Sequence, residues 1–272
     1  MAWNRLAEGI RFLDSITSGL SYGYHTYSTW GLTMESDDVG FPDLLNNDID
    51  SYISMLGIPS LDAKTKKYGR RKMTFNFGTK VSSRWPNLVN TITAAIHGQK
   101  KVIYRDCEPN YVYIGRCYVR AYAPTRGIGK IQIEVDAEPY KVARTSTTVD
   151  FTDPTGFRYQ YNGKYETPVT IGIYTPRYYS GGSMTLTCYN YSTSGEVFYK
   201  AIIENIGSSA FESTIFIRGG EKRFLFDRDY SQQPTGKMEY RFPVLLPGKS
   251  HYFVFSGLTP SRAYLQFNDR MI

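Results

Sequence analysis

Histidine and cysteine side chains are common catalytic bases, nucleophiles and metal ligands, and this chain of 272 residues has few of either. Its three histidines are His25, His97 and His251, and none stands near another histidine or a cysteine at the spacing of a metal site. His97 lies at the end of a predicted helix, where a partial positive charge suits the helix dipole. We therefore expect structural or surface roles for the histidines, with no bound metal and no cofactor.

Motifs for nucleophilic catalysis and phosphate binding are absent from the sequence, which has no GxSxG, no P-loop and no GxGxxG after a strand. Two pairs of acids, Glu134 with Asp136 and Asp227 with Asp229, could face one side of a strand as a glycosidase pair does. Such pairs are common on exposed strands, and only a suitable separation across a cleft would give them catalytic meaning. The sequence therefore predicts a protein that is not an enzyme.

One local cluster of basic residues stands out, the segment KTKKYGRRK at Lys64–Lys72. It could contact phosphate groups, but a solvated loop or a contact to an acidic protein neighbour is more common for so short a run. We take four of its members as candidate contacts to a protein partner: Lys66, Lys67, Arg70 and Arg71.

Tyrosines in the second half of the chain could stack on sugars, as they do in sandwich lectins. The candidates are Tyr159, Tyr161, Tyr178 and Tyr179. The competing interpretation is that tyrosine serves here as an amphipathic strand and interface residue, and its abundance in both halves favours that interpretation. Carbohydrate binding remains an alternative function.

The composition favours strands over helices. Aromatic residues make up 15% of the chain, 24 of them tyrosines, while charged residues are only 21% and the mean hydropathy is −0.39. The net charge of +7 suits an acidic partner but is spread too widely to name one. A chain of this length predicts two ordinary globular domains.

The cysteines and the hydropathy bear on where the protein is found. Cys107, Cys117 and Cys188 form an odd set without CxxC spacing, and we expect free thiols, although Cys107 and Cys117 could approach one another. The N-terminal residues lack the unbroken apolar stretch of a signal peptide, and no later run reaches the roughly 18 apolar residues of a membrane span. We expect a soluble protein without membrane insertion.

The elements that must position these residues centre on Gln99–Lys141. This stretch predicts three strands in a row, at Lys101–Arg105, Tyr111–Tyr122 and Ile128–Glu138. Apolar and polar residues alternate along the last of them, which indicates one buried and one solvated face. The strands end at Pro139, because proline cannot donate to a central ladder.

One helix is predicted ahead of these strands, at Trp85–His97, with Ser83 as its N-cap and Gly98 as its C-terminal stop. Its apolar face must pack on a sheet, and the strands that follow are the nearest candidates. Upstream, Met73–Val81 alternates as a strand does, and Tyr22–Met34 is interpreted as a strand pair or an extended segment.

The remainder predicts a second, all-β domain. Residues 1–141 form the first domain, the polar stretch 142–149 is interpreted as a linker, and residues 150–272 form a β-sandwich. The predicted strands of the sandwich are Thr167–Tyr174, Met184–Asn190, Val197–Ile206, Thr214–Arg218, Arg223–Asp227, Lys237–Leu246, His251–Ser256 and Ala263–Phe267.

The order of these elements resembles the distal tail proteins (the Dit family) of bacteriophages with long, non-contractile tails. A helix precedes a strand that ends in acidic residues and proline, a Tyr-x-Gly strand follows at Tyr113-Ile114-Gly115, and the last strand ends in the run Asp136–Lys141. Weaker similarities are an early YG…GL segment at Tyr22–Leu32 and a PG turn at Leu246-Pro247-Gly248. The similarity is specific at 72–141 and loose elsewhere.

The resemblance implies a mainly β protein, with an N-terminal ring-forming domain that packs one α-helix and a C-terminal galectin-like β-sandwich. It implies a non-enzymatic homohexameric ring at the tip of a phage tail, docked between the tail tube and the tail-tip hub protein. The sandwiches would point outward, where they hold receptor-binding or adhesion proteins or contact host glycans. The basic residues named above then become candidate ring contacts.

Overall fold

The computed structural model describes residues 9–16, 20–42, 68–80, 84–125, 127–153, 156–176, 181–190, 196–207, 213–227 and 234–272. Strands dominate these residues, which confirms the predicted mainly β class. The chain divides into two compact units, with the boundary between Arg144 and Thr145.

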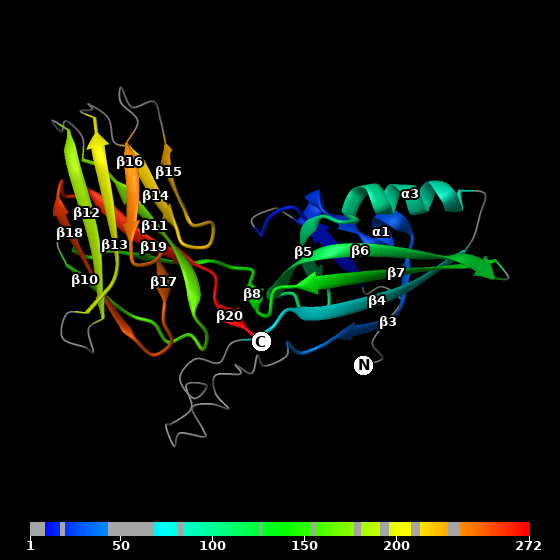
Figure 1. Cartoon of the computed structure of the whole chain (residues 1–272). Coiled ribbons are helices and arrows are strands. Elements are labelled where there is room, and N and C mark those ends of the chain that lie inside the picture. Colours follow the sequence, from blue (N-terminus) through cyan, green and yellow to red (C-terminus); the bar gives the residue numbers. More distant parts are fainter. Residues whose placement is uncertain are drawn as a thin grey trace, which may run out of the picture. The chain divides into compact units, whose positions relative to one another are not determined.

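The first unit is built on one antiparallel sheet (Figure 1). Its strands are β1 (Ile10–Leu13), β2 (Tyr24–His25), β3 (Thr33–Val39), β4 (Arg71–Lys80), β5 (Lys100–Arg105), β6 (Tyr111–Thr125), β7 (Ile128–Ala137) and β8 (Lys141–Ala143). The strand order is β2-β1-β5-β6-β7-β4-β3, and β8 pairs with β6 outside that path. The three strands predicted within Gln99–Lys141 are thus β5, β6 and β7, adjacent in the sheet.

Alternation along β7 determines which face of this sheet is buried. Ile131, Ile133 and Val135 are at most 2% exposed, whereas Gln132 and Glu134 on the other face are partly exposed. The buried side chains join those of β4 and of the long helix in one core. The predicted division into a buried and a solvated face is confirmed.

The long helix is α3 (Trp85–Ile96), which lies along one face of the sheet (Figure 1). Ile92 and Ile96 are fully buried against the sheet, as the apolar period predicts. Arg84 occupies the N-cap position without a capping side-chain bond, while Ser83, the predicted cap, lies outside the described residues. Gly98 follows with a φ of 73°, a conformation that favours glycine, and the helix stops there.

A second, short helix corrects the predicted extended pair at Tyr22–Met34. After η2 (Leu20–Tyr22) and β2, the chain forms α1 (Thr26–Trp30) before it enters β3. The sequence TYSTW is poor in strong helix formers, so no periodic pattern marks this turn of helix. It begins because the His25 side chain accepts a hydrogen bond from the backbone N–H of Ser28, an N-cap interaction.

The second unit contains two antiparallel sheets (Figure 1). Their strands are β9 (Thr147–Asp150), β10 (Phe157–Gln160), β11 (Thr167–Tyr174), β12 (Gly182–Asn190), β13 (Glu196–Ile206), β14 (Thr214–Arg218), β15 (Arg223–Asp227), β16 (Thr235–Glu239), β17 (Val244–Leu245), β18 (Ser250–Gly257) and β19 (Arg262–Phe267), and the short β20 (Arg270–Met271) belongs to neither sheet. One sheet has the order β10-β18-β12-β13-β16, and the other has β15-β14-β11-β19-β9 with β17 paired to β11.

Both sheets of this unit contribute side chains to one core, which makes it a β-sandwich. Ile171 and Leu265 come from one sheet, Leu186 and Phe253 from the other, and all four are fully buried. Within the described residues of this unit no helix occurs. The all-β second half was predicted from its short apolar runs and turn residues, and the structure has this architecture.

Two details differ from the predicted elements. The strand expected at Lys237–Leu246 is divided into β16 and β17, and Tyr240 between them has a φ of 73°, far from the extended conformation of a regular strand. The stretch 142–149, interpreted as a linker, contains the end of β8 and most of β9. Its polar sequence conceals this pairing, because both strands are short and lie largely at the surface.

Candidate functional site

Two of the four basic residues predicted to contact a partner, Arg70 and Arg71, lie in the described part of the chain, and they differ sharply. Arg70 is exposed and pairs with Asp136 on the solvated face of the first sheet, with a Nε–Oδ1 distance of 2.6 Å. Arg71 is only 3% exposed, and its guanidinium lies 5.2 Å from the centre of the Tyr113 ring. Lys66 and Lys67 lie outside the described residues. Of the described pair, only Arg70 is exposed.

The tyrosines predicted to stack on sugars do not form a platform in the described part of the chain. Tyr161 is 2% exposed, and its hydroxyl is hydrogen-bonded to Thr167 and Asp269 within the second unit. Tyr159 is half-buried against Phe267. Tyr178 and Tyr179 lie outside the described residues. Tyr161 is a core residue because its ring fills the sandwich, so it cannot stack on a sugar in this fold.

The predicted acid pair on β7 is engaged in surface ion pairs. Glu134 pairs with Arg120 at 3.0 Å and Asp136 pairs with Arg70, so neither acid faces the other across a cleft. Asp229 lies outside the described residues, as does the side chain of Asp227. The arrangement of Glu134 and Asp136 gives no support to glycosidase chemistry.

The structure instead gathers charged groups around the turn between β5 and β6. We call the first group the Glu108 cluster, which comprises Glu108, Arg105, Tyr113, Lys141 and Arg71. The Glu108 carboxylate accepts hydrogen bonds from Arg105 Nη1 at 2.9 Å, from the Tyr113 hydroxyl at 2.7 Å and from Lys141 Nζ at 2.9 Å. Arg71 completes the cluster over the face of the Tyr113 ring. One carboxylate therefore joins β5, β6 and β8.

Electrostatics make this cluster stable in its charged form. Burial alone would raise the pKa of Glu108, but the hydrogen bonds from Tyr113 and Lys141 and the charge of Arg105 outweigh it and lower that pKa below its ordinary value. Burial, together with the Glu108 carboxylate, raises the pKa of Tyr113 to about 12. The acid stays ionised with its oxygens occupied, and the phenol stays protonated. Neither group is placed to act as a base at neutral pH.

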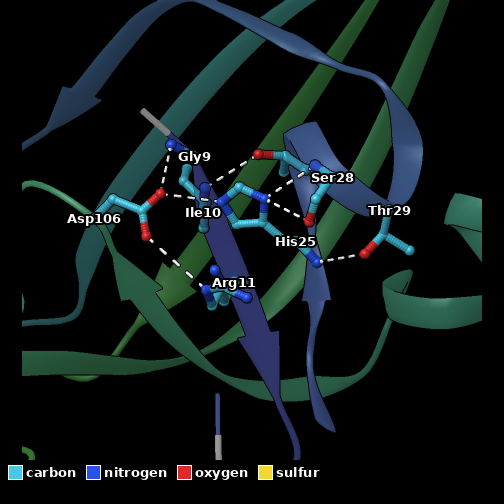
Figure 2. A network of polar contacts seen from close by, with 8 residues as sticks. Gly9, Ile10, Arg11, His25, Ser28, Thr29 and Asp106 are labelled. Carbon is cyan, nitrogen blue, oxygen red and sulfur yellow. Dashed lines mark hydrogen bonds and ion pairs between the residues drawn. The ribbon is translucent and has the colours of Figure 1, made fainter. Parts of the chain in front are cut away.

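The second group is the His25 cluster, which comprises His25, Asp106, Ser28, Gly9 and Arg11 (Figure 2). His25 Nε2 lies 3.0 Å from Asp106 Oδ2, and its Nδ1 lies 3.0 Å from both the backbone nitrogen and the hydroxyl of Ser28. The same carboxylate accepts the backbone N–H of Gly9 at 3.0 Å and lies 3.9 Å from Arg11 Nε. Asp106 thus connects the β5–β6 turn to the start of β1 and to α1.

A serine, a histidine and an aspartate in contact raise the question of nucleophilic catalysis. In a catalytic triad the histidine nitrogen that faces the serine must be free to take the hydroxyl proton. Here that nitrogen, Nδ1, already accepts the backbone N–H of Ser28, which can only donate. The lone pair of His25 therefore caps α1 and is not free to activate the hydroxyl of Ser28.

The second buried histidine lies in the second unit. His251 is fully buried, and burial lowers its pKa to about 4. Its Nε2 accepts the backbone N–H of Leu246 at 3.0 Å, and its Nδ1 lies 3.8 Å from Cys188 Sγ. Burial also raises the pKa of the Cys188 thiol to about 12, so the thiol stays protonated and unreactive. Among the described residues no group of three or more His, Cys, Asp or Glu side chains could hold a metal ion.

Sequence motifs did not indicate either cluster, because their members are separated by as many as 97 residues. A sequence signal nevertheless existed. The Glu108 cluster draws Glu108 from CEP, Tyr113 from Tyr113-Ile114-Gly115 and Lys141 from EPYK, the runs that carry the family resemblance. Gly115, from the same Tyr113-Ile114-Gly115 run, lies very close to β7, because a Cβ at this position would be 2.7 Å from the Cα of Ala137.

A solved structure that matches the chain bears on its fold. No family model and no curated protein matches the chain. Among the solved structures that match the chain is "Crystal Structure of SPP1 Dit (gp 19.1) Protein, a Paradigm of Hub Adsorption Apparatus in Gram-positive Infecting Phages", with a TM-score of 0.60 and 13% sequence identity. The two chains share a fold. The match covers 98% of this chain and 100% of the other, so it spans both units. Within the described residues, no helix is long and apolar enough to cross a membrane.

Proposed function

We propose that this protein is a structural component of a phage tail tip, a distal tail protein without enzymatic activity. The observation that carries the proposal is the shared fold with the SPP1 Dit protein over nearly the whole of both chains. A likeness confined to one sandwich would be weak, because such sandwiches serve many functions. A similarity that covers both a sheet unit with a packed helix and the sandwich that follows it is more specific than similarity to a sandwich alone.

In this role the protein forms a homohexameric ring at the distal end of the tail. The first unit surrounds the channel and joins the tail tube to the tail-tip hub protein, and the galectin-like second unit holds receptor-binding or adhesion proteins. The protein is made in the host cytoplasm and resides in the virion. The polar clusters fit a structural role, because their carboxylates are occupied by cations and N–H donors.

Light scattering coupled to gel filtration tests the ring directly. We expect the purified protein to be a hexamer, alone or after mixing with the tail-tip hub protein, and negative-stain images to show a ring with a central hole. Arg70→Glu tests whether this exposed basic residue of the first unit contributes to the ring. The matched control is Arg262→Glu, which alters an exposed arginine of the second unit. A chain that stays monomeric under both conditions would refute the proposal.

The alternative is an adhesin that binds host glycans through the second unit. It needs an exposed aromatic surface, and of the tyrosines first considered Tyr161 is in the core and Tyr159 is half-buried. A glycan array with the full chain and with Tyr159→Ala tests it. Binding that depends on Tyr159 would favour the adhesin, and absence of binding would leave the sandwich as a platform for proteins.

A further inference from the structure

His25 occupies an unusual position, because a titratable ring supplies the N-cap of a very short helix. The helix α1 has five residues, and a helix of that length has little stability of its own. Two threonine side chains of α1 make further hydrogen bonds near the cap. Thr29 Oγ1 accepts the backbone N–H of His25 at 3.1 Å, and Thr26 Oγ1 accepts the backbone N–H of Ile10 at 3.0 Å. The Thr26 bond joins α1 to β1, whereas the cap and the Thr29 bond join α1 to His25 (Figure 2).

The hydrogen bonds of His25 determine its protonation state in this arrangement. The backbone N–H of Ser28 can only donate, so Nδ1 must carry a lone pair. The ring proton therefore lies on Nε2, which donates to Asp106 Oδ2. The arrangement shown in Figure 2 is thus specific to the neutral imidazole.

Protonation of the ring would place a hydrogen on Nδ1, facing the N–H of Ser28 across 3.0 Å. Two donors cannot share a hydrogen bond, so the cap would be lost. The hydroxyl of Ser28 could accept the new N–H only by displacing its own backbone N–H from the ring. At the same time Asp106 would attract the imidazolium, so the charged ring has a partner once the cap has opened.

The charged groups around His25 are few. In the described structure Asp106 contacts the ring directly, and Arg11 from β1 faces the other oxygen of that carboxylate. Arg105, the neighbour of Asp106, turns to Asp37 and Glu108. Neither α1 nor β2 has any charged residue, and they contribute only hydroxyls and backbone groups to the ring's surroundings. The balance between the neutral and the protonated ring therefore depends on Asp106, Arg11 and the backbone N–H of Ser28.

We propose that His25 is a pH-sensitive latch, which holds α1 closed when the imidazole is neutral and releases it when the ring is protonated. The latch controls a surface as well as a helix. Tyr22, Tyr24 and Tyr27 surround α1 with exposed fractions of 85%, 40% and 50%, and the Tyr24 ring stacks on Trp30 at 5.5 Å. Release of α1 disorders this aromatic surface of the first unit. The inference does not depend on the proposed ring.

Hydrogen exchange on the full-length protein tests the latch. Protection factors for the segment Tyr24–Leu32 are measured between about pH 8 and about pH 5, the range in which histidine titrates, after correction for intrinsic exchange. We expect protection of this segment to fall about tenfold across that range, as expected for loss of one N-cap, while β6 and β7 keep theirs. Protection that stays constant with pH in the wild-type protein would overturn the proposal.

Three variants separate the latch from general acid sensitivity. His25→Asn keeps a side-chain oxygen that caps a helix but cannot titrate, so its α1 protection should be independent of pH. Asp106→Asn removes the carboxylate that attracts the imidazolium, so the transition should move to lower pH. His97→Asn is the matched control, because the Nδ1 of His97 also accepts a backbone N–H, that of Val119, and this variant should behave as wild type. An unchanged transition in His25→Asn would also refute the latch.

Discussion

The hydroxyl of Tyr113 donates a hydrogen bond to the carboxylate of Glu108 at 2.7 Å, and this contact joins the β5–β6 turn to the core of the first sheet. Tyr113 is 2% exposed, so its phenol has no access to water as a substitute acceptor. Lys141 reaches the other oxygen of the same carboxylate from β8. Glu108 therefore joins Tyr113 in β6 to Lys141 in β8.

Replacing Glu108 by glutamine should destabilise the first unit. Glutamine keeps an acceptor for Tyr113 but removes the negative charge opposite Arg105 and Lys141, so we expect the free energy of unfolding to fall by about 2 kcal/mol. Chemical denaturation measures this. The matched control is Glu134→Gln, whose partner Arg120 is 61% exposed, and it should lose less than about 1 kcal/mol. Equal losses in both variants would contradict the structural role of Glu108.

The same acid should contribute to loss of stability at low pH. The pKa of Glu108 is lowered in the folded protein, so its stabilising contribution is present above the ordinary value of 4.5 and is lost as the pH falls through the folded pKa. The stability of the first unit should therefore depend less on pH below about 4.5 in Glu108→Gln than in the wild type. Denaturant titrations at several acidic pH values measure the two slopes.

Gly115 should tolerate no side chain. A Cβ at this position would lie 2.6 Å from Val135 Cγ1 and 2.8 Å from the carbonyl oxygen of Asp136, and the backbone of β7 cannot move away without breaking its pairing. We expect Gly115→Ala to cost about 1 to 3 kcal/mol, as measured by thermal or chemical unfolding. In Gly220→Ala the nearest atom would be 3.7 Å away, so that variant should be close to neutral.

Local sequence patterns predicted the strands well where one face is buried. Alternation along β7 and the run of apolar residues in β11 follow from the need to bury one side of each strand, and this need leaves a period of two in the sequence. The same reasoning located α3, whose apolar residues recur with the period of a helix. The break between β16 and β17 was missed because the conformation of Tyr240 leaves no mark on that period.

The polar clusters could not be predicted in this way, because they depend on contacts between distant segments. His25 and Asp106 are 81 residues apart, and no local spacing relates them. The burial of Arg71 was equally hidden, since a run of basic residues indicates a solvated segment unless an aromatic ring covers one of them. Tyr161 was expected at the surface but is buried. Tyrosine is found both at surfaces and in cores that supply a hydrogen-bond partner for its hydroxyl, so its type alone does not predict its burial.

Ile133→Asp tests the assignment of faces along β7. Ile133 is fully buried in the core of the first unit, and an unpaired carboxylate there costs several kcal/mol, enough to unfold a marginally stable unit. We expect loss of the folded first unit and of any ring, as seen by circular dichroism and gel filtration. The neighbouring change Gln132→Asp lies on the solvated face and should cost about 1 kcal/mol or less. Normal assembly of Ile133→Asp would show that this strand is wrongly placed.

His251 should make the second unit sensitive to acid at a higher pH than carboxylates do. Burial lowers its pKa from 6.5 to about 4, so between these values the unfolded chain binds a proton that the folded chain excludes. Stability therefore falls as the pH decreases through this window. The shift corresponds to a loss of about 3 kcal/mol by pH 4, since one unit of pKa is worth about 1.4 kcal/mol.

His251→Gln tests this prediction, because glutamine can still accept the backbone N–H of Leu246 but does not titrate. We expect the variant to be less stable than wild type at neutral pH, since glutamine fills the buried site less well, and to lose much less stability between about pH 6.5 and about pH 4. His97→Gln in the first unit is the control and should leave the pH dependence of the second unit unchanged. Equal pH dependence in the wild type and in His251→Gln would show that protonation of this ring does not limit the acid stability of the sandwich.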